Sequence, residues 1–123
     1  FTVETTSLEN VLENSDFVTL HVPKTGEKAV IGAEEIGLMK TGAGIVNTAR
    51  GGVIDEDALM FSLDKGKLAY AALDVFNNEP NPSMHLMMHN SLSLTPHIGA
   101  ATEEAQDRIG TDLAEKIITF FKK

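Results

Sequence analysis

Apolar residues along this chain form two kinds of pattern, short continuous runs and stripes with helical spacing. The continuous runs are typical of buried strands. We predict strands over residues 16–22, 44–48, 68–75 and 92–95. We predict helices over residues 33–39 and 56–65, and a last helix from about residue 102 to about residue 121. Strands that alternate with helices in this way predict a parallel sheet of the α/β class.

Particular residues support the first and the last predicted helix. Thr6 and Glu9 have the form of a capping box, so a short helix is expected to begin there. The last helix has an apolar residue at every fourth position along one side: Ala105, Ile109, Leu113, Ile117 and Phe121. Residues 76–91 are predicted to form a loop, because three of the four prolines lie in this segment or close to it.

Three residues with chemically useful side chains follow three consecutive predicted strands. Arg50 follows the second strand, Glu79 follows the third and His97 follows the fourth. Taken singly, each is best explained as an ordinary surface residue. In open parallel sheets, however, ligands bind at the carboxyl ends of the strands, so we expect the three side chains to surround one crevice.

The chemistry of this set suits a keto acid or a hydroxy acid. Arg50 offers a planar fork of donors that matches a carboxylate. His97 can exchange a proton near neutral pH. A hydrogen bond with Glu79 would favour the imidazolium form of His97. We therefore predict reduction of a keto acid, in which hydride reaches the carbonyl carbon while the histidine protonates the oxygen, or the reverse reaction.

Composition narrows the possible partners. The chain has 123 residues, 42% of them hydrophobic, which is enough for one globular domain with a core. A net charge of −8 argues against nucleic acid or an anionic membrane as a partner. The lack of cysteine excludes disulfides and thiolate metal sites and fits a reducing compartment, so we expect a cytoplasmic protein. No run of about 18 apolar residues is present to span a membrane.

His85 and His89 could form a metal pair, but no third ligand is obvious, and we predict no metal site.

Four motifs identify a family that the chain resembles. They are NTARGGVIDE at 47–56, ALDVFNNEP at 72–80, LTPHIGAATEEAQ at 94–106 and LHVPKT at 20–25. In this order they resemble the D-isomer-specific 2-hydroxyacid dehydrogenases, and the resemblance covers nearly the whole chain. It implies NAD as cofactor and a Rossmann-like doubly wound parallel sheet. Within the family, the Glu-Ala-Gln of the third motif is most similar to the D-3-phosphoglycerate dehydrogenases, which begin L-serine biosynthesis.

The resemblance also implies roles for single residues. Arg50 matches the substrate-binding arginine, His97 the catalytic proton donor or acceptor, and Glu79 the acid that pairs with it. Asp74 matches a carboxylate near the nicotinamide. The positions implied to line the cofactor are Thr48, Ala49, Arg50, Asp74, His97, Gly99 and Ala100.

The chain lacks the motif with which the family binds the pyrophosphate of the cofactor. The Gly-x-Gly-x-x-Gly turn is missing, because Gly42-Ala43-Gly44 leads into a strand and not into a helix. The acidic residue expected at the adenosine ribose is also missing. Phe1-Thr2-Val3 has the pattern of a strand end and no initiator methionine precedes it. We therefore expect residues 1–123 to be the second half of an NAD-binding domain. Such a fragment would be inactive alone, whereas the intact protein would be a homo-oligomer.

Two alternatives remain open at this stage. The first is another dehydrogenase of the family, acting on glyoxylate, hydroxypyruvate or D-lactate, and the choice between NAD and NADP is open as well. The second is a non-catalytic α/β module that serves in assembly. Arg50, Glu79 and His97 argue against the second alternative, because a module without catalysis has no reason to keep all three.

Overall fold

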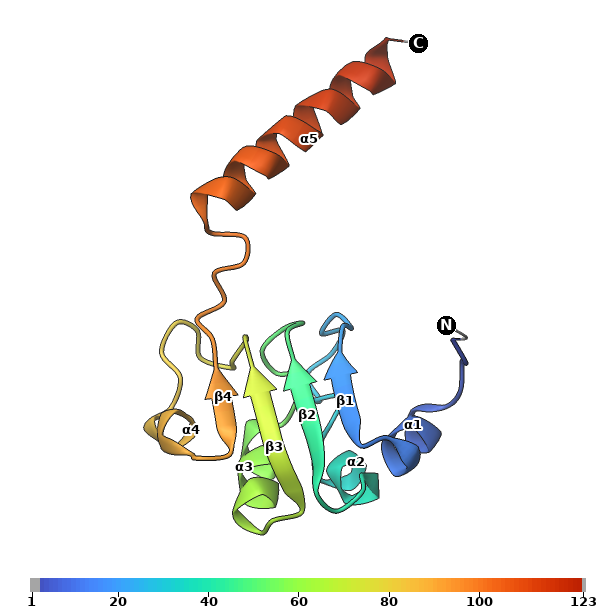
Figure 1. Cartoon of the computed structure of the whole chain (residues 1–123), viewed down its shortest axis with the longest axis vertical. Coiled ribbons are helices and arrows are strands. Elements are labelled where there is room, and N and C mark those ends of the chain that lie inside the picture. The colour runs from blue at the N-terminus through green and yellow to red at the C-terminus, as the bar shows by residue number, and fades with distance from the viewer. Residues whose placement is uncertain (1–2, 123) are drawn as a thin grey trace.

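The computed structural model describes residues 3–122, so the predicted strand end at Phe1-Thr2 lies outside the described residues. Helices and strands alternate along the chain (Figure 1). In chain order they are α1 (Leu8–Asn14), β1 (Phe17–Leu20), α2 (Ala33–Leu38), β2 (Ala43–Asn47), α3 (Glu56–Asp64), β3 (Leu68–Leu73), α4 (Met84–Met88), β4 (Leu92–Leu94) and α5 (Glu103–Phe121).

The strands form one parallel sheet in the order β1-β2-β3-β4. Val18 lies opposite Ile45, which in turn lies opposite Ala71. The side chains of these three residues therefore lie side by side on the same face of the sheet. The connections between successive strands pass through α2, α3 and α4, as parallel strands require. The carboxyl ends of all four strands therefore lie at one edge of the sheet, which is the upper edge in Figure 1. The predicted parallel α/β sheet is confirmed.

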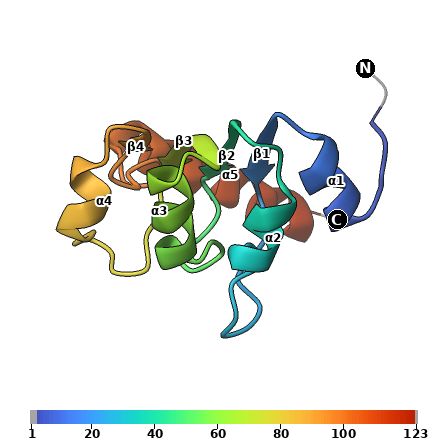
Figure 2. The ribbon, with the colours of Figure 1, turned by 90° about the horizontal axis from the view of Figure 1, so that it is seen from below.

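The helices cover one face of the sheet. Figure 2 shows α2 and α3 on the same side of the strands. Val18 and Leu20 point to this side and are buried, whereas Phe17, the first residue of β1, is 72% exposed on the other side. Tyr70 is 64% exposed on that second face. The sheet therefore has one covered face and one open face.

The core lies between this face and the helices. Its fully buried side chains come from helices, strands and connecting segments alike: Leu12, Ile31, Met39, Ile45, Val53, Ile54, Leu59, Leu68, Val75 and Leu86. Each such side chain contributes about 1.5–3 kcal/mol by leaving water. This packing fixes the strands and, with them, the loops at their carboxyl ends.

Two local predictions were wrong in detail. Ser7, and not Thr6, caps α1, because the Ser7 hydroxyl accepts a hydrogen bond from the Asn10 amide at 3.3 Å. The predicted loop over residues 76–91 contains α4, which Ser83 caps by accepting from Leu86 N. Five residues are too few to show a helical period, but Ser83 was a local sign of a helix start.

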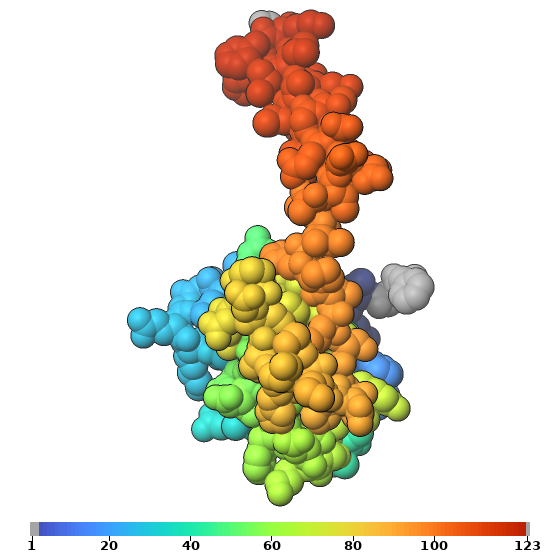
Figure 3. All heavy atoms as spheres, turned by 90° about the vertical axis from the view of Figure 1, so that its left-hand side faces the viewer, coloured from blue at the N-terminus to red at the C-terminus, as the bar shows by residue number. Residues whose placement is uncertain are grey.

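The last helix stands apart from the sheet. None of its residues is buried, and the stripe that includes Ile109, Leu113 and Ile117 is exposed. Figure 3 shows α5 joined to the rest of the molecule by a narrow connection. Thr102 caps the N-terminus of α5, so the helix begins where the sequence predicted. No helix within residues 3–122 combines the length and the apolar character needed to cross a bilayer.

Candidate active site

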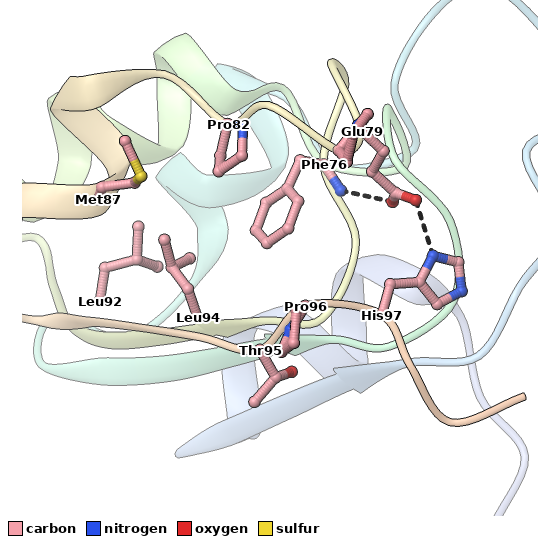
Figure 4. Close-up of a pocket in the computed structure, with 10 residues that line it drawn as sticks. Phe76, Glu79, Pro82, Met87, Leu92, Leu94, Thr95, Pro96 and His97 are labelled. Carbon is pink, nitrogen blue, oxygen red and sulfur yellow. Dashed lines mark hydrogen bonds and ion pairs between the residues drawn. The ribbon is translucent and has the colours of Figure 1, made fainter. Parts of the chain in front are cut away.

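His97 and Glu79 form a hydrogen-bonded pair at the carboxyl edge of the sheet. The Nδ1 atom of His97 lies 2.7 Å from Oε2 of Glu79, and Oε1 of the same carboxylate accepts a hydrogen bond from the Phe76 amide at 2.9 Å (Figure 4). The side chains are 39% and 34% exposed, so both are open to a ligand. The hydrogen bond from His97, followed by that from Phe76 N, lowers the pKa of Glu79 below its ordinary value.

The backbone of His97 adopts a conformation that few side chains tolerate. Its φ is +51°, in the left-handed region. The carboxylate of Asp74 accepts from the His97 amide at 3.1 Å and from the Thr95 hydroxyl at 2.5 Å. A carboxylate at the end of β3 therefore holds the turn after β4 in this conformation, which fixes the direction of the imidazole.

Arg50 faces the same cavity as this pair. The cavity has a volume of about 490 Å³. It is lined by Pro23, Lys24, Arg50, Gly51, Phe76, Asn77, Glu79 and His97. The Nη1 atom of Arg50 donates to the Ala49 carbonyl at 2.6 Å, so the guanidinium lies against its own loop and not against Glu79. The three side chains that follow consecutive strands are thus brought together around one space.

Asn47 shapes the loop that carries Arg50, and the sequence pattern did not single it out. This residue ends β2 and is 2% exposed. Its side chain accepts from Ala49 N and donates to the Arg50 carbonyl, both at 3.0 Å. Its carbonyl accepts from Asp74 N at 3.0 Å, which links the ends of β2 and β3. A buried amide directly before a loop was the signal that could have identified it.

Lys24 was also missed. It follows β1 and lines the cavity together with Arg50. Its ammonium group lies close to Gly52, where an added Cβ would be 2.4 Å from Nζ. The cavity therefore holds two cationic side chains beside the pair of Glu79 and His97, which suits an anionic ligand.

A larger apolar cavity of about 910 Å³ adjoins the pair on the side of β4. Figure 4 shows Phe76 in its middle, with Pro82, Met87, Leu92 and Leu94 around the ring. His97 and Glu79 line both cavities. The pair therefore lies at the boundary between an apolar space and a cationic one.

His85 and His89 do not lie in a loop, as the sequence pattern suggested. His85 belongs to α4 and His89 caps its end. Both rings approach Asp64, with His89 Nε2 at 3.4 Å and His85 Nε2 at 3.9 Å. His89 Nδ1 accepts from Ser91 N at 3.1 Å. In the part of the chain that the structure describes, no group of three potential ligands has the geometry of a metal site.

The motifs and this geometry agree with the comparisons. The family model of the D-isomer specific 2-hydroxyacid dehydrogenase, NAD binding domain, matches residues 1–99. The chain belongs to this family. It is 50% identical over 111 residues to the D-3-phosphoglycerate dehydrogenase of Methanocaldococcus jannaschii, covering 89% of this chain and 21% of that protein. It is 44% identical to D-3-phosphoglycerate dehydrogenase 2, chloroplastic, of Arabidopsis thaliana, covering 94% of this chain and 19% of that protein.

Solved structures of the family share the fold. A D-isomer-specific 2-hydroxyacid dehydrogenase of Polaromonas sp. JS6 66 superposes with a TM-score of 0.82 at 33% identity, covering 94% of this chain and 37% of the other. The Rossmann-like class predicted for the sheet is thereby confirmed. The chain spans about a fifth of the length of the curated relatives it matches.

Five further residues follow the strands: Thr48, Ala49, Asp74, Gly99 and Ala100. Thr48 is exposed and Ala49 is half-buried directly after β2, and Asp74 offers a carboxylate after β3. Gly99 and Ala100 are exposed on the connection to α5, and nothing lies within 4 Å of the position of a Cβ at Gly99. These five residues do not line the 490 Å³ cavity of Arg50 and His97. They carry a hydroxyl, a carboxylate and backbone groups that follow the carboxyl ends of the strands.

Proposed function

We propose that this chain is the second half of the NAD-binding domain of an enzyme that oxidises a D-2-hydroxy acid to the 2-keto acid. The observation that carries the proposal is the meeting of Arg50, Glu79 and His97 around one cavity, with 2.7 Å between the last two side chains. These residues follow three different strands, so their meeting depends on the fold and not on sequence proximity.

The reaction divides between this chain and the cofactor. Thr48, Asp74 and Gly99 would hold NAD, which would supply the acceptor for the hydride that leaves C2 of the substrate. Arg50 turns its guanidinium from the Ala49 carbonyl to the substrate carboxylate, which it binds in a bidentate manner.

His97 takes the proton of the substrate hydroxyl. Its Nδ1 atom is engaged by Glu79, so Nε2 is the atom left to face the substrate oxygen. Loss of the hydride and the proton turns the C2 alcohol into a ketone, and the imidazolium that forms is stabilised by the Glu79 carboxylate. In the reverse direction the imidazolium returns the proton.

The proposed substrate is 3-phosphoglycerate, which would be oxidised to 3-phosphohydroxypyruvate in the first step of L-serine biosynthesis. Support comes from the names of the relatives at 44% and 50% identity and from the two cations, Lys24 and Arg50, in the cavity. Glyoxylate, hydroxypyruvate and D-lactate are the alternative substrates. The cytoplasm and a homo-oligomeric intact protein are parts of the same proposal.

The 123 residues are proposed to be inactive by themselves. They lack the glycine-rich turn for the pyrophosphate, and hydride transfer needs a cofactor held in a fixed position. The test is an assay of the full-length protein that carries this chain, with NAD and 3-phosphoglycerate, D-glycerate, glycolate or D-lactate in parallel. We expect NADH to form faster with 3-phosphoglycerate than with the other three acids. If NADH formed only with another of these acids, that acid would replace 3-phosphoglycerate as the proposed substrate. If no NADH formed with any of them, the proposed function would be refuted.

A further inference from the structure

The short segment that carries Glu79 is held by contacts from the loop of Arg50 and from α3. The successive backbone amides of Phe76 and Asn77 lie at the centre of these contacts. Phe76 N donates to Oε1 of Glu79 at 2.9 Å, and Asn77 N donates to Oε1 of Glu56 at 2.6 Å. Glu56 is the first residue of α3 and lies 21 positions before Asn77 in the sequence.

The glycines after Arg50 allow this segment to lie close to the loop. A Cβ at Gly51 would lie 1.9 Å from the Phe76 carbonyl oxygen, so only glycine permits the approach. Gly52 has a φ of +77°, and a Cβ there would lie 3.1 Å from the Asn77 side-chain oxygen. The Phe76–Asn77 peptide is thus enclosed between these glycines on one side and the Glu56 carboxylate on another.

The surroundings of Glu56 oppose its charged form. It is half-buried, and this burial raises its pKa, with further increases from the charges of Asp57 and Asp55. The hydrogen bond from Asn77 acts in the opposite direction. The hydrogen bond from Asn77 N is thus the contact that favours the Glu56 carboxylate at this place.

We propose that Glu56 is a positioning residue for the pair of Glu79 and His97. By holding the Asn77 amide, Glu56 fixes the peptide whose neighbouring amide, that of Phe76, orients the Glu79 carboxylate towards His97 Nδ1. Glu56 touches neither His97 nor the proposed substrate cavity and acts only through this peptide. Its importance for turnover rests on the function proposed above, whereas its effect on the geometry of the pair does not.

The experiment measures that geometry in the full-length protein that carries this chain. The imidazole ¹⁵N chemical shifts of His97 are recorded by NMR for the wild type and for Glu56→Ala, Glu56→Gln and Asp57→Asn, with Glu79→Gln as the reference for a broken pair. The exchange rate of the Asn77 amide reports on the contact itself. Gln keeps the acceptor oxygen at position 56, and Asp57→Asn makes the same change of charge one residue away from it.

Glu56→Ala is expected to speed exchange of the Asn77 amide about tenfold, the effect of one lost charged hydrogen bond. It is also expected to move the His97 shifts towards those of Glu79→Gln. Glu56→Gln and Asp57→Asn are expected to keep the wild-type His97 shifts. Unchanged His97 shifts in Glu56→Ala would overturn the proposal, and so would equal changes in Asp57→Asn, which would show an effect of charge alone.

A second variant covers the case in which Glu56→Ala does not fold. Glu56→Asp keeps the charge but shortens the side chain by one methylene, so that its carboxylate no longer reaches Asn77 N. It is expected to change the His97 shifts as Glu56→Ala does, and wild-type shifts in this variant would refute the positioning role. Because no turnover is measured, an inactive full-length protein would refute the proposed function and leave this result intact.

Discussion

The imidazole of His97 and the carboxylate of Glu79 are joined by a 2.7 Å hydrogen bond, although the two residues follow different strands of the sheet. The second oxygen of Glu79 is fixed by Phe76 N, and the backbone of His97 is fixed by Asp74. The pair is therefore oriented from both sides before any ligand binds. Such preorganisation favours proton transfer to or from a bound ligand.

The first prediction concerns the titration of Glu79. Its pKa is lowered first of all by the hydrogen bond from His97, so a ¹³C NMR titration of the wild-type chain should place it below the ordinary glutamate value of about 4.3. In His97→Ala the midpoint should move upwards towards that value. A lowered folded-state pKa means that the contribution to stability is present above the unfolded value and is lost as pH falls through the folded value. The same midpoint in both proteins would contradict the pairing.

The second prediction concerns Arg50. Arg50→Lys in the full-length protein replaces the planar fork by a single ammonium group, which loses one hydrogen bond to the substrate carboxylate. We expect kcat/KM for the hydroxy acid to fall about 10- to 100-fold, mainly through KM. Arg108→Lys on α5 is the matched control and should keep wild-type kinetics. Equal effects of the two substitutions would show that Arg50 does not bind the substrate.

The third prediction concerns Gly51. Gly51→Ala places a methyl group 1.9 Å from the backbone oxygen of Phe76, where no side chain can move aside. The loop must shift, and we expect urea unfolding to show a loss of about 1–3 kcal/mol or more.

Gly37→Ala is the control for this substitution. Gly37 lies within α2, and nothing lies within 4 Å of the position of its added Cβ. Here alanine should stabilise the protein by about 0.5–1 kcal/mol through helix propensity. The account of Gly51 fails if its alanine variant is as stable as the wild type.

The fourth prediction concerns Asn47. Asn47→Ala removes two side-chain hydrogen bonds from a residue that is 2% exposed and leaves Ala49 N and the Arg50 carbonyl without these partners. A loss of about 1–3 kcal/mol in the free energy of unfolding is expected. Asn14→Ala, on the exposed end of α1, should change the free energy by about 0.5 kcal/mol or less. Similar losses for both would mean that the Asn47 contacts do not hold the loop.

Local patterns were enough to predict the sheet and the three strand-end residues. Short segments rich in apolar residues, each close to turn residues, identified all four strands, because a strand leaves this signal within a few residues. The rule that ligands bind at the carboxyl ends of strands then placed Arg50, Glu79 and His97 around one cavity. The prediction needed no knowledge of side-chain contacts.

Contacts between distant residues were beyond the reach of these patterns. The Asn77 amide donates a hydrogen bond to Glu56, which lies 21 positions away in the sequence, and neither residue type predicts this contact. Helix α4 was missed because five residues do not complete enough turns to show a period. The stripe along α5 was recognised, but an amphipathic pattern does not specify the surface that covers it, and within the described residues it remains exposed.

The most direct test of the central claim is the turnover of His97→Asn in the full-length protein, with NAD and 3-phosphoglycerate. Asparagine fills part of the same space but cannot exchange a proton. The account predicts a fall in kcat of about 10²- to 10⁴-fold, the usual contribution of a general base. Wild-type kcat in this variant would show that the pair of His97 and Glu79 does not carry the proton.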